Sequence, residues 1–141
     1  MPSSERRIVL IACSSKKLSE SARARDLYIS PLFQLSFAYA EALNPDAIYI
    51  LSAKHGFVRP DHILLPYDES LREMGATEMK KWTERVLMGL RLVADPWNNE
   101  FIILAGERYR RYLEPQLMNV QVPLKGLRIG QQLQFLKRAL T

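Results

Sequence analysis

The chain has 141 residues and a hydrophobic fraction of 48%, which together are typical of one globular domain with a buried core. No apolar run is long enough to cross a bilayer and no signal-like segment follows the N-terminus, so we expect a cytoplasmic protein without membrane contact. The single cysteine excludes an internal disulfide. The net charge of +5 arises in the second half of the chain. It indicates either a polyanionic partner or a solvated basic face.

Apolar runs alternate with segments of helical periodicity along the chain. The runs predict strands at 7–13, 47–53 and 100–105, with a short fourth strand at 120–122. Helices are predicted at 30–43, 77–94, 107–117 and 131–140. Long loops are predicted at 14–30, 54–71 and 123–130. The alternation predicts a single domain over 1–141, a three-layer α/β/α sandwich with a mainly parallel sheet of three to four strands.

Two of the helix starts have their own signals. Ser30 precedes Pro31, and serine at the N-cap with proline at the first helical position favours a helix there. Thr77 follows Gly75 and is the N-cap candidate of the next helix.

Small and polar side chains follow each of the three main strands. Ligands of open α/β sheets bind beyond the carboxyl ends of the strands, so we expect one pocket there. The expected substrate-binding residues are Cys13, Ser14, Ser15, Lys16, Lys17, Tyr28, Ser52, Gly56, Tyr67, Gly106 and Tyr109. The hydroxyls and lysines of the first loop suit an anion, although the loop lacks the glycines of a P-loop. Cys13 is either a nucleophile or a small residue that closes the first strand.

The candidate catalytic residues are Lys54, His55, Asp61 and Asp68, all in the long loop after the second strand. A carboxylate can orient water, and histidine suits acid–base chemistry near neutral pH. Alternative explanations are a structural histidine, a turn capped by Asp61, and Asp68 as N-cap of segment 69–74. Arg23 or Arg25 is expected to pair with Asp26. Two histidines and one cysteine give no credible metal-ligand spacing, so we expect no metal and no cofactor.

Basic residues near the C-terminus suggest contact with a nucleic-acid backbone. Arg108, Arg111, Lys125 and Arg128 are the candidates, with Arg110, Lys137 and Arg138 adding non-specific affinity. Leu124 and Leu127 are adjacent to the basic residues of the glycine-containing loop, where an apolar tip would fill the gap left by an extruded base. The alternative is that these basic residues pair with acidic groups and bind nothing.

Several motifs resemble a family of small, mostly uncharacterised bacterial and phage proteins. They are Cys-Ser-x-Lys-Lys-Leu, Ala-Arg-Asp-Leu-Tyr-x-Ser-Pro-Leu-Phe, Leu-Ser-Ala-Lys-His-Gly-Phe-Val-x-Pro-Asp, Pro-Tyr-Asp-x-Ser-Leu and Leu-Ala-Gly-x-x-Tyr. Their order also resembles the catalytic core of archaeosine synthases, which is similar to the uracil-DNA-glycosylase-like fold. The resemblance places Cys13 to Lys17 at the first glycosylase motif and Pro123 to Gly130 at the last. The Gly-Gln-Asp-Pro-Tyr and His-Pro-Ser-Pro motifs are missing, so uracil is not the expected base.

The resemblance and the basic C-terminal part imply a glycosylase-like enzyme that cleaves the N-glycosidic bond of a modified base in nucleic acid. DNA is favoured over RNA as the partner. Two alternatives stay open: a base-modifying transferase, and a non-catalytic nucleic-acid or nucleotide-binding module. The sequence leaves the oligomeric state, the identity of the base and the catalytic carboxylate undecided.

Overall fold

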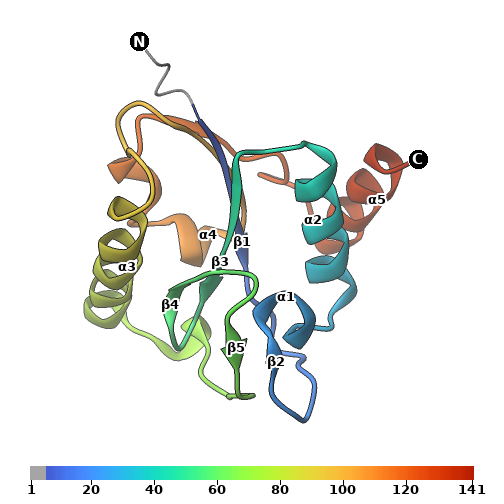
Figure 1. Ribbon diagram of the computed structural model, residues 1–141, viewed down its shortest axis with the longest axis horizontal. Helices are drawn as coiled ribbons and strands as arrows, with labels where there is room; N and C mark the ends of the chain where they lie inside the picture. Colours follow the sequence, from blue (N-terminus) through green and yellow to red (C-terminus); the bar gives the residue numbers. More distant parts are fainter. Residues whose placement is uncertain (1–5) are drawn as a thin grey trace.

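The computed structural model describes residues 6–141 as an α/β domain around a five-stranded sheet (Figure 1). The strands are β1 (Arg7–Ala12), β3 (Ala47–Ser52), β4 (Gly56–Val58), β6 (Glu100–Leu104) and β7 (Asn119–Gln121), in the spatial order β4-β3-β1-β6-β7. All neighbours are parallel except β3 and β4. The central strand β1 is fully buried over Ile8, Val9, Leu10 and Ile11. This explains its continuous apolar run, because both faces of a parallel sheet are covered.

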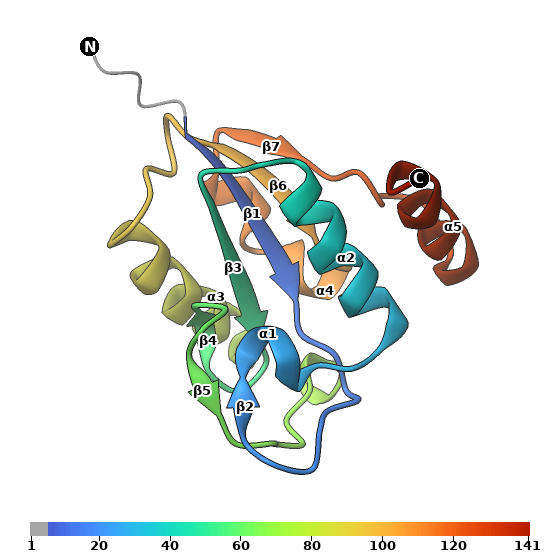
Figure 2. The same cartoon turned by 45° about the vertical axis from the view of Figure 1, so that its right-hand side comes forward.

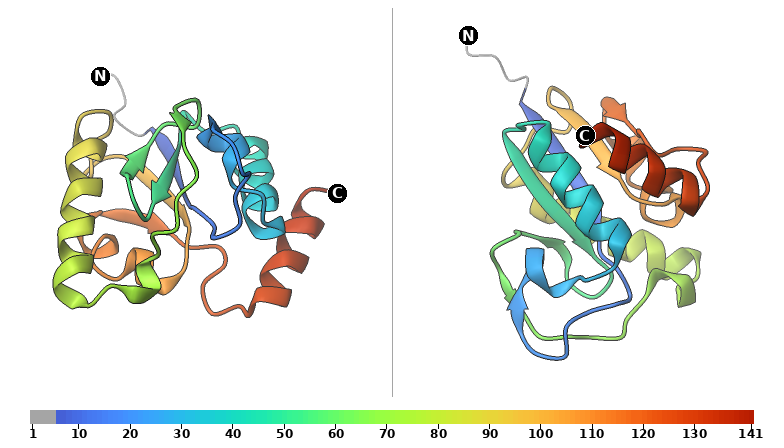
Figure 3. Two further views of the ribbon diagram at one scale, coloured as in Figure 1. Left: turned by 90° about the horizontal axis from the view of Figure 1, so that it is seen from below. Right: turned by 90° about the vertical axis from the view of Figure 1, so that its right-hand side faces the viewer.

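Helices cover both faces of the sheet (Figures 1 and 3). On one side lie α2 (Pro31–Ala42) and α5 (Ile129–Ala139), which pack against each other. On the other side lie α3 (Ala76–Arg91) and the short α4 (Glu107–Arg110). Gly89 of α3 lies so close to β4 that a Cβ atom there would be 2.8 Å from Cβ of Phe57. None of the helices within residues 6–141 is long and apolar enough to cross a membrane.

A second, smaller layer lies beyond the carboxyl ends of β1 and β3 (Figure 2). It contains the antiparallel pair β2 (Ala22–Arg23) and β5 (Ile63–Leu64) and the one-turn helix α1 (Ala24–Leu27). The 3₁₀ turn η1 (Leu71–Glu73) precedes α3, and η2 (Glu114–Gln116) precedes β7. This layer is formed by parts of segments 14–30 and 54–71, two of the three segments that the sequence predicts as long loops.

The predicted α/β class, the mainly parallel sheet and its flanking helices are confirmed, but the sheet has five strands because β4 forms within the segment predicted as one loop. Strand β5 lies in the same segment and pairs with β2 outside this sheet. The predicted helix over 107–117 is wrong in extent, since it is regular only over α4. Pro115 explains the break: it lacks an N–H and disfavours helical geometry in the residue before it. Helix α3 begins with Gly75 as N-cap, not Thr77. Helix α5 begins earlier than predicted, where the Arg128 N–H donates to Gln131 Oε1 at 2.9 Å.

Candidate functional site

A cavity of about 290 Å³ opens where the carboxyl ends of β1 and β6 meet. The chain leaves β1 toward β3 on one side and returns to β6 on the other, so this is the switch point of the sheet, where open α/β folds bind ligands. Its lining comes from five places in the chain. The lining includes Cys13, Ser14, Ser30, Leu32, Phe33, Ser36, Leu104, Gly106, Glu107, Arg110, Leu124, Lys125, Leu127 and Gln132.

Local structure explains how these side chains reach the cavity. Ser30 caps α2 by accepting a hydrogen bond from the Phe33 N–H at 3.2 Å, and Pro31 fills the first helical position as predicted. One turn further, the buried Ser36 also faces the cavity. On the far wall, a tight turn with Gly126 at φ +81° returns the chain from Leu124 to Leu127.

Cys13 links the ends of the three central strands. Its Sγ lies 3.3 Å from the hydroxyl of Tyr109 and accepts a hydrogen bond from the Ala53 N–H at 3.4 Å. Its own N–H donates to the Leu51 carbonyl at 3.0 Å. Burial raises the pKa of Tyr109, so its hydroxyl keeps its proton at neutral pH. The thiol is therefore fixed in place and reaches the cavity wall.

A buried hydroxyl cluster lies beside the cavity at the end of β3. The hydroxyl of Tyr67 is 2.6 Å from that of Tyr28 and 2.8 Å from Ser52 Oγ, which accepts the His55 N–H at 3.0 Å. Burial raises the pKa of Tyr28 to about 12 and raises that of Tyr67 as well. The Ser52 carbonyl accepts a hydrogen bond from Trp82 Nε1 at 2.8 Å, which ties the cluster to α3.

Lys17 and His55 lie against the rim of this cluster. Lys17 Nζ is 4.3 Å from the ring centre of Tyr67, and its backbone bridges to Tyr28. The imidazole of His55 contacts the Tyr67 ring edge-on with centres 5.5 Å apart. Partial burial and the neighbouring Lys54 lower the pKa of His55. The imidazole is therefore largely neutral at pH 7.

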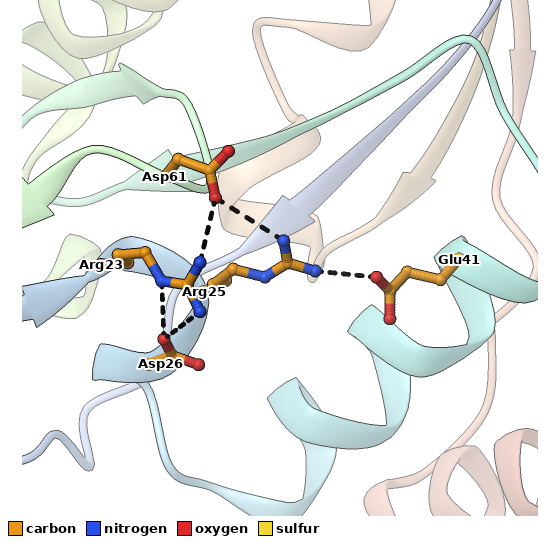
Figure 4. Close-up of polar contacts among 5 residues, drawn as sticks. All are labelled: Arg23, Arg25, Asp26, Glu41 and Asp61. Atoms are coloured by element: carbon orange, nitrogen blue, oxygen red, sulfur yellow. Dashed lines mark hydrogen bonds and ion pairs between the residues drawn. The ribbon is translucent and has the colours of Figure 1, made fainter.

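Asp61 belongs to an ion network outside the cavity (Figure 4). Its Oδ1 lies 3.7 Å from Arg23 and 3.6 Å from Arg25, and its side chain is 74% exposed. Arg23 also pairs with Asp26 at 3.0 Å, as predicted, and Arg25 with Glu41 of α2 at 2.7 Å. The network therefore holds the β2–β5 layer against α2.

The other predicted catalytic residues also lie away from the cavity lining. Asp68 is exposed, and Ser70 rather than Asp68 caps the following turn, so the capping alternative for Asp68 is wrong. Lys54 Nζ is 4.0 Å from Glu69. Gly56 adopts φ +76° in the turn that pairs β4 with β3 and faces Arg85 of α3. Ser15 and Lys16 are exposed on the loop after β1.

The predicted backbone-binding arginines are divided between different roles. Arg108 donates to the Leu71 carbonyl at 3.3 Å, whereas Arg111 forms a two-point ion pair with Glu107 at 2.8 and 2.6 Å. Lys125 and Arg128 are exposed on their loop. The expectation of an exposed apolar tip is wrong for Leu124, because that residue is buried in the core.

The structure therefore separates the predicted site residues into groups. Cys13, Ser14 and Gly106 line the cavity, and Tyr28, Ser52, Tyr67 and Tyr109 lie beside it in the hydrogen-bonded clusters. Sequence reasoning missed Ser30, Ser36, Glu107, Arg110 and Gln132 as lining residues.

Of these missed residues, Glu107 follows the same strand-end rule that selected Gly106 and was therefore detectable. Ser36 and Gln132 lie within helices, where only the packing directs them inward. Within residues 6–141 no group of three or more His, Cys, Asp or Glu side chains is arranged to hold a metal ion.

Comparison with known proteins identifies relatives of the chain, but their descriptions name no activity. The family described as "Family of unknown function (DUF6884)" matches residues 8–138. The uncharacterized protein YfjM of Bacillus subtilis (strain 168) is 30% identical over 151 aligned positions, which cover 95% of each chain. No solved structure shows significant similarity to the chain.

Proposed function

The chain belongs to the DUF6884 family of unknown function, and we propose that it is a glycosylase-like enzyme that binds a nucleobase of nucleic acid in the switch-point cavity and hydrolyses its N-glycosidic bond. The observation that carries this proposal is the cavity itself, where β1 and β6 end. Its volume of about 290 Å³ lies at the lower end of the roughly 300–1,000 Å³ range of small-molecule sites. That size favours a single base or nucleoside over a dinucleotide cofactor.

The lining suits the two kinds of surface that a nucleobase presents. Apolar walls from Phe33, Leu104 and Leu127 match the faces of a planar ring. Ser36 and Gln132 place a hydroxyl and an amide at the same wall, where they can bind the polar edge of the ring. An extruded base needs both surfaces, because it loses its stacking and its pairing partners together.

Basic residues at the rim favour a substrate that carries phosphate. Lys125 is exposed beside the cavity on the glycine-containing turn. Arg110 is held in place from two sides, donating to the Ala105 carbonyl at 3.0 Å and to Glu114 at 3.0 Å. In the proposed complex the exposed Lys125 contacts the backbone next to an extruded nucleotide, and Arg110, whose side chain is only 11% exposed, adds positive charge at the cavity wall.

Glu107 is the carboxylate that we assign to hydrolysis, since it lines the cavity whereas Asp61 and Asp68 do not. The hydrogen bonds from Arg111 lower the pKa of Glu107 and keep it ionised. In the proposed step Glu107 orients a water molecule toward C1′ of the sugar and stabilises the developing sugar cation. The water oxygen bonds to C1′ as the C1′–N bond breaks. The base leaves with the electron pair and is protonated, and the water proton passes to solvent.

The test is release of free base, measured by mass spectrometry after incubation with DNA and RNA that carry natural, damaged and hypermodified bases. Glu107→Gln should reduce base release by about 100-fold or more, because the amide keeps the shape but not the charge. Asp61→Asn is the matched control and should retain near wild-type activity. Loss of activity in Asp61→Asn with normal activity in Glu107→Gln would move the site to the ion network. No free base from any substrate would refute hydrolysis.

A base-modifying transferase is the second candidate, and the position of Cys13 favours it. The thiol lies at the cavity wall and accepts a hydrogen bond from the Ala53 N–H, an arrangement that stabilises a nucleophilic sulfur. A transferase would increase the mass of the treated nucleic acid without releasing a base. Mass spectrometry of both the polymer and the free base distinguishes the two reactions, and Cys13→Ser should abolish only transfer.

A further inference from the structure

Two shallower hollows continue from the cavity along the outer surface of α4. The first, of about 280 Å³, is lined by Glu107, Arg110, Arg111, Glu114 and Pro115, and it shares Glu107 and Arg110 with the cavity. The second, of about 410 Å³, includes Pro115 again together with Lys80, Lys81, Tyr112 and Gln116. Because each hollow shares a lining residue with the next, the three lie side by side from the switch point to α3, and this row of hollows is called the groove.

We propose that this groove binds the single-stranded segment of nucleic acid that flanks the base held in the cavity. The inference rests on the proposed function, because it needs a polymer whose base occupies the cavity. Beyond the proposed function, the inference specifies that the substrate is single-stranded and states the direction in which the strand leaves the cavity.

The charges along the groove suit a phosphate backbone. Lys80 and Lys81 are exposed on the first half of α3. Arg111 is paired with Glu107, and its side chain is about half exposed, so it adds positive charge to the groove while it keeps its contact with Glu107. The acidic residues Glu84 and Glu114 also line the hollows, so the groove favours a strand that contacts a few phosphates over a long duplex.

Tyr112 provides the aromatic surface that single strands need. Its ring is half-buried at the end of the groove, and Lys80 Nζ lies 5.4 Å from the ring centre. Bases stack on such rings regardless of sequence, while neighbouring cations bind the phosphates.

Binding of a short fluorescein-labelled oligothymidylate, followed by anisotropy across a salt series, tests the groove. Lys80→Ala with Lys81→Ala should weaken binding at low salt about tenfold and reduce the salt slope by about 1.4, the value for two contacts to a single strand. Tyr112→Ala should weaken binding about 5- to 100-fold, whereas Tyr112→Phe should retain it. The control is Lys137→Ala with Arg138→Ala, which removes the same charge from α5 on the opposite side of the sheet and should have little effect.

The possible results separate the two proposals. Unchanged binding in the Lys80/Lys81 and Tyr112 variants, or a larger loss in the α5 control, would overturn the groove. A hairpin duplex that binds more tightly than the single strand would overturn it as well. If the wild-type protein binds the strand through these residues but releases no free base, the hydrolase proposal fails while the groove stands. If the wild-type protein releases free base and none of these variants changes that release, the groove proposal fails while the hydrolase proposal stands.

Discussion

Removal of one hydroxyl from the buried cluster should destabilise the fold measurably. Tyr67→Phe deletes the atom that lies 2.6 Å from the Tyr28 hydroxyl and 2.8 Å from Ser52 Oγ. The hydrogen bond to Ser52 is lost at about 1 kcal/mol, and the buried Tyr28 hydroxyl loses its Tyr67 partner at about 1–3 kcal/mol. We expect a loss of about 2–4 kcal/mol in the free energy of unfolding, because Ser52 keeps its bond from the His55 N–H.

Urea denaturation followed by tryptophan fluorescence measures this change, and an unchanged m-value would show that the unfolded state is not affected. The double variant Tyr28→Phe with Tyr67→Phe removes both partners of the shared bond. It should therefore be less destabilised than the sum of the single variants, by about 1–2 kcal/mol. Additive single effects, or a loss below about 0.5 kcal/mol for Tyr67→Phe, would show that the cluster is not a closed hydrogen-bonded unit.

Three further predictions follow from named contacts. Burial raises the pKa of Tyr28 to about 12. The contribution of its protonated hydroxyl to the free energy of unfolding is therefore fully present below pH 10 and should be lost between pH 10 and 12, by on the order of 2–3 kcal/mol. Urea midpoints measured across alkaline pH test this loss, and a midpoint that does not change with pH would contradict it. Ser30→Ala should cost about 1 kcal/mol by loss of the α2 cap, and a thermal melt no lower than that of wild type would contradict it. Gly89→Ala should cost about 1–3 kcal/mol because its Cβ would be 2.8 Å from Cβ of Phe57, and Phe57→Gly, which removes that Cβ, should cost less in the Gly89→Ala chain than in the wild type.

Sequence reasoning predicted the parts of the fold that depend on local patterns. The buried strands β1, β3 and β6 and the Ser30–Pro31 start of α2 were predictable, because apolar runs and capping residues act within a few positions. The strands β4 and β5 were not, because they have only three and two residues. Strand β4 turns back onto β3 with Ser52 opposite Gly56, whereas β5 pairs with the distant β2. The extent of the helix over 107–117 was wrong for a local reason, because Pro115 within the segment outweighed the helical periodicity.

The candidate site was predictable as a location but not as a set of contacts. The rule that ligands bind at carboxyl ends of strands placed Cys13, Ser14 and Gly106 at the cavity. It could not separate Asp61 from Glu107, because both follow strands closely in sequence. In the structure the two residues lie in different places, because the long loop directs Asp61 to its ion pairs with Arg23 and Arg25, outside the cavity.

The most direct test of the central claim is a crystal structure of the protein with a nucleobase or a nucleoside monophosphate bound. We predict a planar ring in the cavity between β1 and β6, with its faces against Phe33 and Leu127 and its edge toward Ser36 and Gln132. A ligand bound beside Lys17 and His55, or at the exposed Asp61 network, with the cavity between β1 and β6 left empty, would contradict the assignment of the switch-point cavity as the functional site.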